Sequence, residues 1–303
     1  MADARSVAYP HLERLSRVEC RQLLPGASVG RLAVPSPHFP TLEPVSFAVV
    51  EGELVVAVRA GSAGEAVAAE TVVTFEADVV DNAGRQGWSV VVSGRVEELD
   101  ADVAAVVRPE LRPWPVTDAD RLLLIRSERI SGQRVVAGPD PAKDIAGTAL
   151  PAERPVGAAR YTRRSVATDE ALRLVAKGGQ QVGRLVVGVP GEPAVFPLNF
   201  VVDGDAVVFR TQVGTKLTAI TRSLVTFEVD DIDATGHGWA VCFQGLAQEV
   251  LEADPEALHA RIAATSVDTW PGGERAHVVR ILPYRVEGTA FLAAEVAAGA
   301  PRP

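Results

Sequence analysis

A short polar segment in the second half of the chain combines the residue types that bind a phosphate monoester. The segment Arg210–Lys216 places a guanidinium, two hydroxyls, a glycine and an ammonium within seven residues. Cations balance the phosphate charge, hydroxyl and backbone donors bind its oxygens, and glycine lets the backbone approach. A helix expected to begin near Thr215 would add its positive N-terminal end. The segment indicates an anion site, although an ordinary polar hairpin end explains it equally well when it is taken alone.

The segment belongs to one of two copies of a repeated sequence. Several short motifs recur in the same order at offsets of 151 to 156 residues, as insertions and deletions in loops would produce. The pairs are Val29–Val34 with Val182–Val187, Pro44–Val49 with Pro197–Val202, Val73–Asp78 with Val225–Asp230, Gly87–Val90 with Gly238–Val241, Trp114-Pro115 with Trp270-Pro271, and Arg129–Gly132 with Arg285–Gly288. Solenoid repeats have periods of about 20–50 residues, so a repeat of this length indicates two duplicated domains.

The first copy lacks the groups of the phosphate segment. At the repeat offset, Lys216 falls on Ala63 or Gly64, and the Arg-Thr pair falls on Ala57-Val58 or Val58-Arg59. Glu65 follows directly and has the wrong charge for a phosphate neighbour. We therefore expect one cofactor site per chain or fewer.

The elements that position the segment are predicted to be strands. Short apolar runs rich in Val, Phe and Thr alternate with turn residues, which is typical of antiparallel hairpins. About six strands and one or two helices per copy predict a small barrel. Ser16 and Glu19 have capping-box spacing, so a short helix is expected to open copy one, as one capped by Thr168 or Asp169 opens copy two. A further helix is expected over Asp254–Ala264.

Composition shifts set the domain boundaries. Residues 1–137 form the expected first domain, in which the phosphate segment is degenerate, and residues 161–303 form the second, which retains it. Residues 138–160 between them are rich in Pro, Gly and Ala without periodicity, which predicts a linker.

Charge and hydropathy narrow the classes of partner. The net charge is −9 and the pI is near 5.2, whereas a nucleic-acid surface needs clustered lysine and arginine. No apolar run approaches the roughly 20 residues that span a bilayer, and the first residues lack the apolar core of a signal peptide. Cys20 and Cys242 lie one in each half and suggest no disulfide framework. We expect a cytoplasmic protein with no nucleic-acid or membrane partner.

The other polar residues identify no catalytic group and no metal site. The five histidines lack metal-ligand spacing, and no Ser-His-Asp set can be assigned. His237, in a glycine-rich turn, is the histidine nearest the phosphate segment, and a solvated turn residue is its simpler interpretation. The acidic pair Glu76 and Asp78 recurs as Glu228 and Asp230, and we interpret it as a repeated structural turn.

Taken in order, the motifs V-G-R-L, P-x-N-F-V-V-D-G-D, V-V-F-R-T-x-x-G-T-K-L, V-T-F-E-V-D and G-W-x-V-x-x-x-G resemble the FMN-binding split-barrel proteins, most closely the pyridoxamine 5′-phosphate oxidase-like family. The resemblance covers nearly all of copy two, from Val182 to about Gly288, and copy one in degenerate form. It implies a mainly β fold with flanking helices, in which two tandem split barrels form a pseudo-dimer within one chain. It also implies FMN bound between the barrels.

The resemblance implies roles for individual residues. The side chains that would bind the phosphate are Arg210, Thr211, Thr215 and Lys216, with Gly214 among them. The ring system would lie along Pro197, Leu198 and Asn199. Trp239 would pack near the interface. The chain lacks the substrate-phosphate arginine and histidine cluster of the name-giving oxidase and its Arg-Leu-x-Pro ending. The resemblance therefore does not extend to that enzyme's substrate.

The function implied is that of an FMN-dependent oxidoreductase acting on a small-molecule substrate or electron donor. Its catalytic residues are not identified, which agrees with a chemistry carried by the flavin. One alternative is a non-catalytic flavin-binding carrier, store or sensor. Another is a split barrel that uses a deazaflavin coenzyme or haem, and for haem only His237 is even loosely placed as an axial ligand. The sequence does not determine the oligomeric state, so a further homodimer formed by two whole chains is also an alternative.

Overall fold

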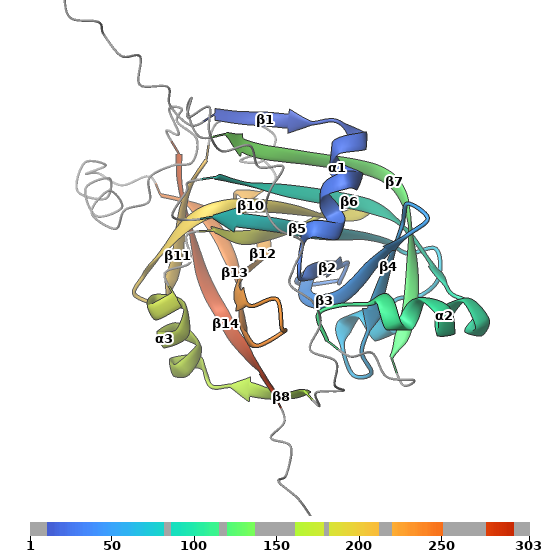
Figure 1. Cartoon of the computed structure of the whole chain (residues 1–303). Coiled ribbons are helices and arrows are strands. Elements are labelled where there is room, and N and C mark those ends of the chain that lie inside the picture. The colour runs from blue at the N-terminus through green and yellow to red at the C-terminus, as the bar shows by residue number, and fades with distance from the viewer. Residues whose placement is uncertain are drawn as a thin grey trace, which may run out of the picture.

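The computed structural model describes residues 11–81, 86–114, 120–136, 161–178, 182–211, 220–250 and 277–293. These residues form two seven-stranded antiparallel sheets, one from each copy, which lie against each other (Figure 1). None of the helices in this part of the chain is long and apolar enough to cross a membrane.

The two copies contain the same succession of strands. Copy one consists of β1 (His11–Leu15), α1 (Arg17–Leu23), β2 (Gly30–Val34), β3 (Thr41–Val50), β4 (Glu53–Val58), β5 (Val72–Asp81), β6 (Gln86–Glu98), α2 (Ala101–Val107) and β7 (Arg121–Val136), with short 3-10 turns at Leu24–Gly26, Ala63–Ala66 and Arg108–Glu110. Copy two consists of β8 (Tyr161–Val166), α3 (Thr168–Gly178), β9 (Val182–Val189), β10 (Glu192–Asp203), β11 (Ala206–Thr211), β12 (Leu224–Ile232), β13 (Gly238–Glu249) and β14 (His277–Ala293).

Each sheet closes into a six-stranded barrel. In copy one the order is β7-β4-β3-β2-β5-β6, and β6 pairs back onto β7. In copy two the order β11-β10-β9-β12-β13-β14 is closed by pairing of β14 with β11. Closure removes the free sheet edges that would otherwise invite association. The seventh strand of each copy, β1 or β8, adds to the outside of the last barrel strand.

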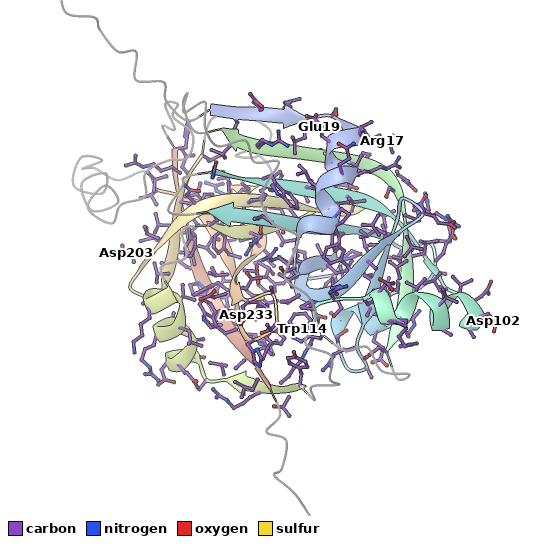
Figure 2. All side chains as sticks on the ribbon, viewed as in Figure 1. Arg17, Glu19, Asp102, Trp114, Asp203 and Asp233 are labelled. Atoms are coloured by element: carbon purple, nitrogen blue, oxygen red, sulfur yellow. The ribbon has the colours of Figure 1, made fainter. Side chains whose placement is uncertain are left out.

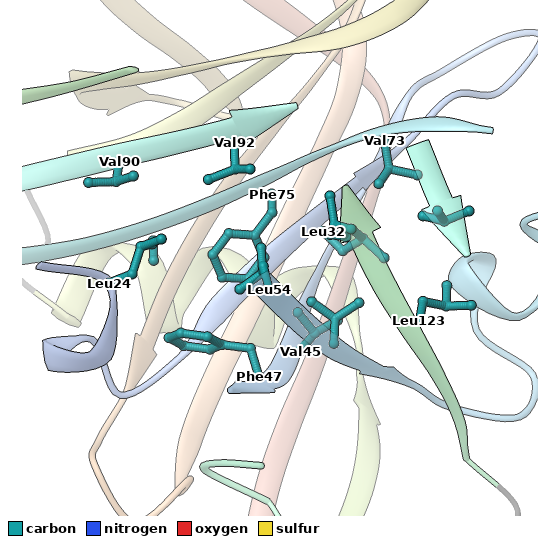
Figure 3. Packing of buried hydrophobic residues seen from close by; sticks show 14 of the residues in the cluster. Leu24, Leu32, Val45, Phe47, Leu54, Val73, Phe75, Val90, Val92 and Leu123 are labelled. Atoms are coloured by element: carbon teal, nitrogen blue, oxygen red, sulfur yellow. The ribbon is translucent and has the colours of Figure 1, made fainter. Parts of the chain in front are cut away.

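The glycine of the repeated V-G-R-L motif is required by the barrel core. A β-carbon on Gly30 would lie 2.1 Å from the ring of Phe75, and one on Gly183 would lie 2.3 Å from the ring of Phe227. Both phenylalanines are fully buried, and Figure 3 shows Phe75 beside Phe47 in the centre of the first barrel. The motif therefore recurs because each barrel packs one aromatic ring against its second strand.

The predicted mainly β fold with two tandem barrels is confirmed. The capping box is also confirmed, since the Ser16 hydroxyl accepts from the amide of Glu19 and the Glu19 carboxylate accepts from the amide of Ser16. Each barrel has the six strands that were predicted. Two details were wrong: a strand outside the barrel precedes the first helix of each copy, and α3 already includes Thr168, which therefore does not cap it. The expected linker over 138–160 and the helices near Thr215 and over 254–264 lie outside the described residues.

The interpretation of the recurring acidic pairs as turns was wrong. Glu76 and Asp78 lie within β5, and Glu228 and Asp230 lie within β12, at the junction of the copies. Arg31 of copy one binds Asp230 of copy two through two bonds, Nε to Oδ2 at 2.7 Å and Nη2 to Oδ1 at 2.8 Å. Arg184 of copy two binds Asp78 of copy one in the same way, with Nη2 to Oδ1 at 2.7 Å and Nε to Oδ2 at 3.1 Å. Each arginine therefore crosses to the other barrel.

Each arginine also contacts the glutamate of its own copy. Nη1 of Arg31 lies 3.2 Å from Oε2 of Glu76, and Nη1 of Arg184 lies 3.5 Å from Oε2 of Glu228. The six side chains, which we call the junction cluster, are Arg31, Glu76, Asp78, Arg184, Glu228 and Asp230, and none is more than 6% exposed. Charges removed from water are stable only when paired, so the copies form one unit.

We predict that Arg31→Met lowers the free energy of unfolding by about 3–5 kcal/mol, because it leaves the buried carboxylate of Asp230 without its bidentate partner. Urea unfolding of both proteins measures the difference. Arg126→Met is the matched control, since its 2.8 Å ion pair with Glu97 is about half exposed and should contribute little. Equal, small effects of the two substitutions would show that the junction cluster does not hold the copies together.

Candidate functional site

A cavity of about 1200 Å³ lies between the two copies. Its walls come from β1, β5, β6 and β7 of copy one and from β9, β10 and β11 of copy two. Ligand pockets typically measure about 300–1,000 Å³. The cavity therefore has room for a large ligand and for a second, small molecule beside it.

Five of the nine cofactor-binding residues predicted from the sequence line this cavity. They are Pro197, Leu198, Asn199, Arg210 and Thr211. The pairing of β10 with β11 brings them together, because Phe200 lies opposite Phe209 and the two groups continue from this pair in opposite chain directions. Gly214, Thr215 and Lys216 lie outside the described residues.

Arg210 and Thr211 form the polar end of this wall. The Nε atom of Arg210 is buried and has no hydrogen-bond partner among the described residues. Thr211 is 5% exposed and is the last residue of β11, directly before the remainder of the predicted phosphate segment. A buried donor on a guanidinium costs free energy until an acceptor meets it, and phosphate oxygens are suited to that position. The residues present fit an anionic group at this end.

Trp239 is not among the residues that line the cavity. It is buried in the core of copy two, and its counterpart in copy one, Trp88, lines the cavity instead. The reason is the packing of the copies, which sets β10 of copy two against β5 and β6 of copy one. Sequence analysis assigned all site residues to copy two and missed this contribution, although the repeat of Gly-Trp pointed to Trp88 as well.

Copy one supplies both apolar and polar side chains to the opposite wall. They are Val80, Trp88, Ser89, Val91, Ser93, Ile130, Ser131 and Gln133. The hydroxyls and the amide are short, neutral groups that can orient a small molecule by hydrogen bonding. The aromatic and aliphatic groups make the remainder of this wall apolar, as in most small-molecule sites.

The cavity also contains charged side chains from both copies. Arg129 of β7 forms an ion pair with Glu192 of β10 and so links the copies across the cavity. Arg17 donates a hydrogen bond to the carbonyl of Ser127 at 3.0 Å, which holds its guanidinium against β7. With Arg14, these side chains place several cations around a cavity whose acidic residues are themselves largely paired. The electrostatics favour an anionic ligand.

The junction cluster forms part of the cavity wall through Asp78. Burial opposes ionisation of this carboxyl, but Arg184 and Arg31 outweigh burial and hold its pKa below the ordinary value. Burial, and then the negative charge of Asp78, raises the pKa of Glu76 to about 8. Burial and the charge of Asp230 likewise raise the pKa of Glu228. Burial and a neighbouring carboxylate therefore favour the protonated form of both glutamic acids, whereas the two arginines favour the ionised form of both aspartates.

This protonation pattern balances the junction cluster. Two guanidinium cations face two aspartate anions, and hydrogen bonding to Asp78 favours the protonated form of Glu76. Four ionised carboxylates against two arginines would leave two uncompensated buried charges, which is costly in a low dielectric.

We predict that wild type loses stability relative to Glu76→Gln as pH rises from about 4.5 to about 8. The raised folded pKa means that the folded state holds a proton that the unfolded state releases above 4.5, at a cost of about 1.4 kcal/mol per pKa unit. Glutamine keeps the neutral shape and does not titrate. Urea unfolding at several pH values across this window measures the difference.

Glu97→Gln is the control for this experiment, because the exposed Glu97 carboxyl has a lowered pKa and changes its charge only below the window. Its difference from wild type should stay constant across the same pH values. A constant difference between wild type and Glu76→Gln would contradict the assignment of a protonated Glu76.

The remaining residues singled out by sequence analysis lie away from the cavity. His237 sits in the hairpin before β13, where its Nδ1 is 2.6 Å from the hydroxyl of Thr235 and its ring lies against Tyr161. Cys20 and Cys242 are free thiols. Among the described residues no group of histidine, cysteine, aspartate or glutamate has the arrangement of a metal site.

Comparison with known proteins assigns the chain to a family. The family model described as "Pyridoxamine 5'-phosphate oxidase" matches residues 16–134 and again residues 167–291. The uncharacterized protein Rv0080 of Mycobacterium tuberculosis is 35% identical over 132 residues, which are 41% of this chain and 85% of that protein. One copy therefore corresponds to nearly the whole relative.

Two solved structures are also similar to part of the chain. The FAD binding protein from Mycobacterium smegmatis is 34% identical, with a TM-score of 0.32, over 42% of this chain and 96% of its own. A FAD-binding protein from Mesorhizobium loti is 21% identical, with a TM-score of 0.38, over 44% of this chain and 99% of its own. The family match extends over both copies and most of the chain, so the protein belongs to the pyridoxamine 5′-phosphate oxidase family as a tandem duplication.

Proposed function

We propose that the cavity binds FMN and that the protein is an FMN-dependent oxidoreductase whose substrate enters the same cavity. The observation that carries the proposal is the meeting, in one space, of the two segments that the family resemblance assigns to FMN. Arg210 and Thr211 lie at one end of the wall and Pro197–Asn199 lie beside them. The Nε atom of Arg210, which has no hydrogen-bond partner in the part of the chain that the structure describes, supports an anion at that end.

The chain's residues would divide the work of binding between the two ends of the cofactor. Arg210 and Thr211 would bind the phosphate, together with Gly214, Thr215 and Lys216 of the adjoining segment. A planar guanidinium and a hydroxyl offer several donors to the phosphate oxygens, and the lysine adds a point charge. This end would fix the register of the ligand in the cavity.

The ring system would lie between the two copies. Pro197 and Leu198 offer an apolar wall, while the backbone groups of the same segment can hydrogen-bond the edge of a flavin. Trp88, with Val91 and Ile130, faces them from copy one. Exclusion of water by both walls strengthens the polar contacts at the ring edge.

When bound, the flavin supplies the acceptor of a hydride from substrate, and this chemistry needs no side-chain acid or base. The chain's own residues bind and orient the substrate. Ser89, Ser131 and Gln133 are among the neutral polar residues of the copy-one wall and could hydrogen-bond a substrate. We propose a small substrate or electron donor that is held by hydrogen bonds rather than by a fixed charge.

We predict that Arg210→Ala and Lys216→Ala each weaken FMN binding about ten- to over a hundredfold. A charge-assisted hydrogen bond in a partly desolvated site is worth roughly 1.5–3 kcal/mol, and each 1.4 kcal/mol is about tenfold in affinity. Fluorescence titration of FMN into each variant measures the dissociation constant, and melting curves show that the fold is retained.

Two controls match these variants. Lys177→Ala removes an exposed lysine of α3, and Arg126→Ala removes an exposed arginine of β7, and both should leave FMN affinity unchanged. Ala63→Lys in copy one should also change little, because its Arg-Thr partners are replaced by Ala57 and Val58. Unchanged affinity in both cavity variants would show that the polar segment is only a hairpin end. FMN binding without reduction by any electron donor would indicate a flavin carrier or sensor instead.

A further inference from the structure

Because the two copies repeat one fold, a second location between them corresponds to the cavity with the roles of the copies exchanged. We call this location the second place. The strand registers give the correspondence. Gly87 pairs with Val135 in copy one as Gly238 pairs with Phe291 in copy two. Likewise, Val45 pairs with Gly30 in copy one as Leu198 pairs with Gly183 in copy two. Around the second place, Val29, Trp114, Ala240 and Phe291 form one buried apolar cluster. Three of these four correspond to the cavity residues Val182, Ser89 and Val135. The fourth, Trp114, matches Trp270 in the repeat, and Trp270 lies outside the described residues.

The indole of Trp114 is held there as a planar ligand would be. It stacks on Phe291 with ring centroids 4.8 Å apart and an interplanar angle of 28°. Its Nε1 donates to the carbonyl of Gly236 at 2.8 Å, and the side chain is 3% exposed. The guanidinium carbon of Arg163 lies 5.5 Å from the indole and 5.1 Å from the ring of Phe291. Figure 2 shows Trp114 beside Asp233, in the hairpin of copy two that contains Gly236.

The backbone before Trp114 occupies the strand edge that corresponds to the ring-binding segment. Ser46, the counterpart of Asn199, accepts a hydrogen bond from the amide of Trp114 and donates one to its carbonyl, at 3.1 and 3.2 Å. Phe47, the counterpart of Phe200, exchanges backbone hydrogen bonds of 2.8 and 3.2 Å with Arg112. The groups that would meet a flavin edge in copy one are therefore satisfied by the chain itself.

The phosphate end of the second place is filled as well. The amide of Ala63, at the position of Lys216, donates to the carboxylate of Glu43 at 2.8 Å. The amide of Gly61 donates to the carboxylate of Glu65. Two side-chain anions thus bind the backbone donors of the loop that corresponds to the phosphate segment. The loss of Arg210, Thr211 and Lys216 counterparts is accompanied by built-in acceptors.

We propose that the second place is an aromatic-ligand site that the chain fills permanently with its own Trp114. The indole, which copy one supplies, contacts copy two and so ties the barrels together where an external ligand would otherwise lie. The chain's own indole thus takes the position of an external ligand at the second place. Only the identity of the ligand in the cavity rests on the proposed function; the filled site is defined by contacts of the chain with itself.

The test uses Trp114→Gly and free indole. The variant keeps the backbone bonds to Ser46 and Phe47 but loses the ring, so its melting temperature should fall by roughly 5–15 °C. Indole should then bind with one more equivalent per chain than in wild type, measured by calorimetric titration, and should restore at least half of the lost melting temperature. Trp114→Phe retains a stacked ring and should show no additional equivalent.

Equal indole stoichiometry in wild type and folded Trp114→Gly would overturn the proposal. If Trp114→Gly does not fold, Trp114→Val retains part of the apolar volume, and the same additional equivalent is required of it. Repeating the titration with FMN present separates the two proposals. Failure of FMN to bind wild type would contradict the proposed function, whereas the additional indole equivalent would still report on the second site.

Discussion

Two arginines that cross between the barrels are the constraint on which the rest of the structure depends. Arg31 and Arg184 each bind an aspartate of the other copy in a place nearly free of water. Such pairs offset the cost of desolvation only when their geometry is maintained on both sides, so the relative position of the barrels is set within narrow limits. Nearby, the Thr74 hydroxyl donates to the carbonyl of Pro193 at 2.6 Å and holds β5 against the start of β10. The cavity exists because these strands are held together.

The junction of the copies creates two corresponding sites: one is the cavity, and the other, the second place, is filled by side chains of the protein itself. The cavity has a large volume and contains the buried Nε donor of Arg210, which no acceptor among the described residues meets. In the second place, the indole of Trp114 lies where the ring system of a ligand would lie, and hydrogen bonds of Ser46 occupy the strand edge beside it. Two carboxylates occupy the position of the phosphate. A duplicated chain can change its two sites independently, whereas a homodimer must change both. The asymmetry is therefore a property of the duplication, and it leaves the junction cluster, which needs both halves alike, nearly symmetric.

Much of the fold could be predicted from the sequence, because a repeat and short alternating strands are local patterns. The capping box of Ser16 and Glu19 could also be predicted, because it depends on two residues only three positions apart. The acidic pairs were visible as a repeat, but the arginines that bind their aspartates lie 106 and 199 positions away in the other copy, which no local pattern indicates. The assignment of Trp239 rather than Trp88 to the cavity had the same cause. The burial of Trp114 depends on Phe291 and Gly236 of the other barrel, so only the assembled structure shows it.

The central claim is that this duplicated barrel pair has one cofactor cavity and that it binds FMN. Its most direct test is the number of FMN molecules bound per chain at saturation, measured by equilibrium dialysis and by the absorbance of the flavin released on denaturation. We predict one FMN per chain. Two per chain would contradict the filling of the second site, and no bound FMN would contradict the assignment of the cavity.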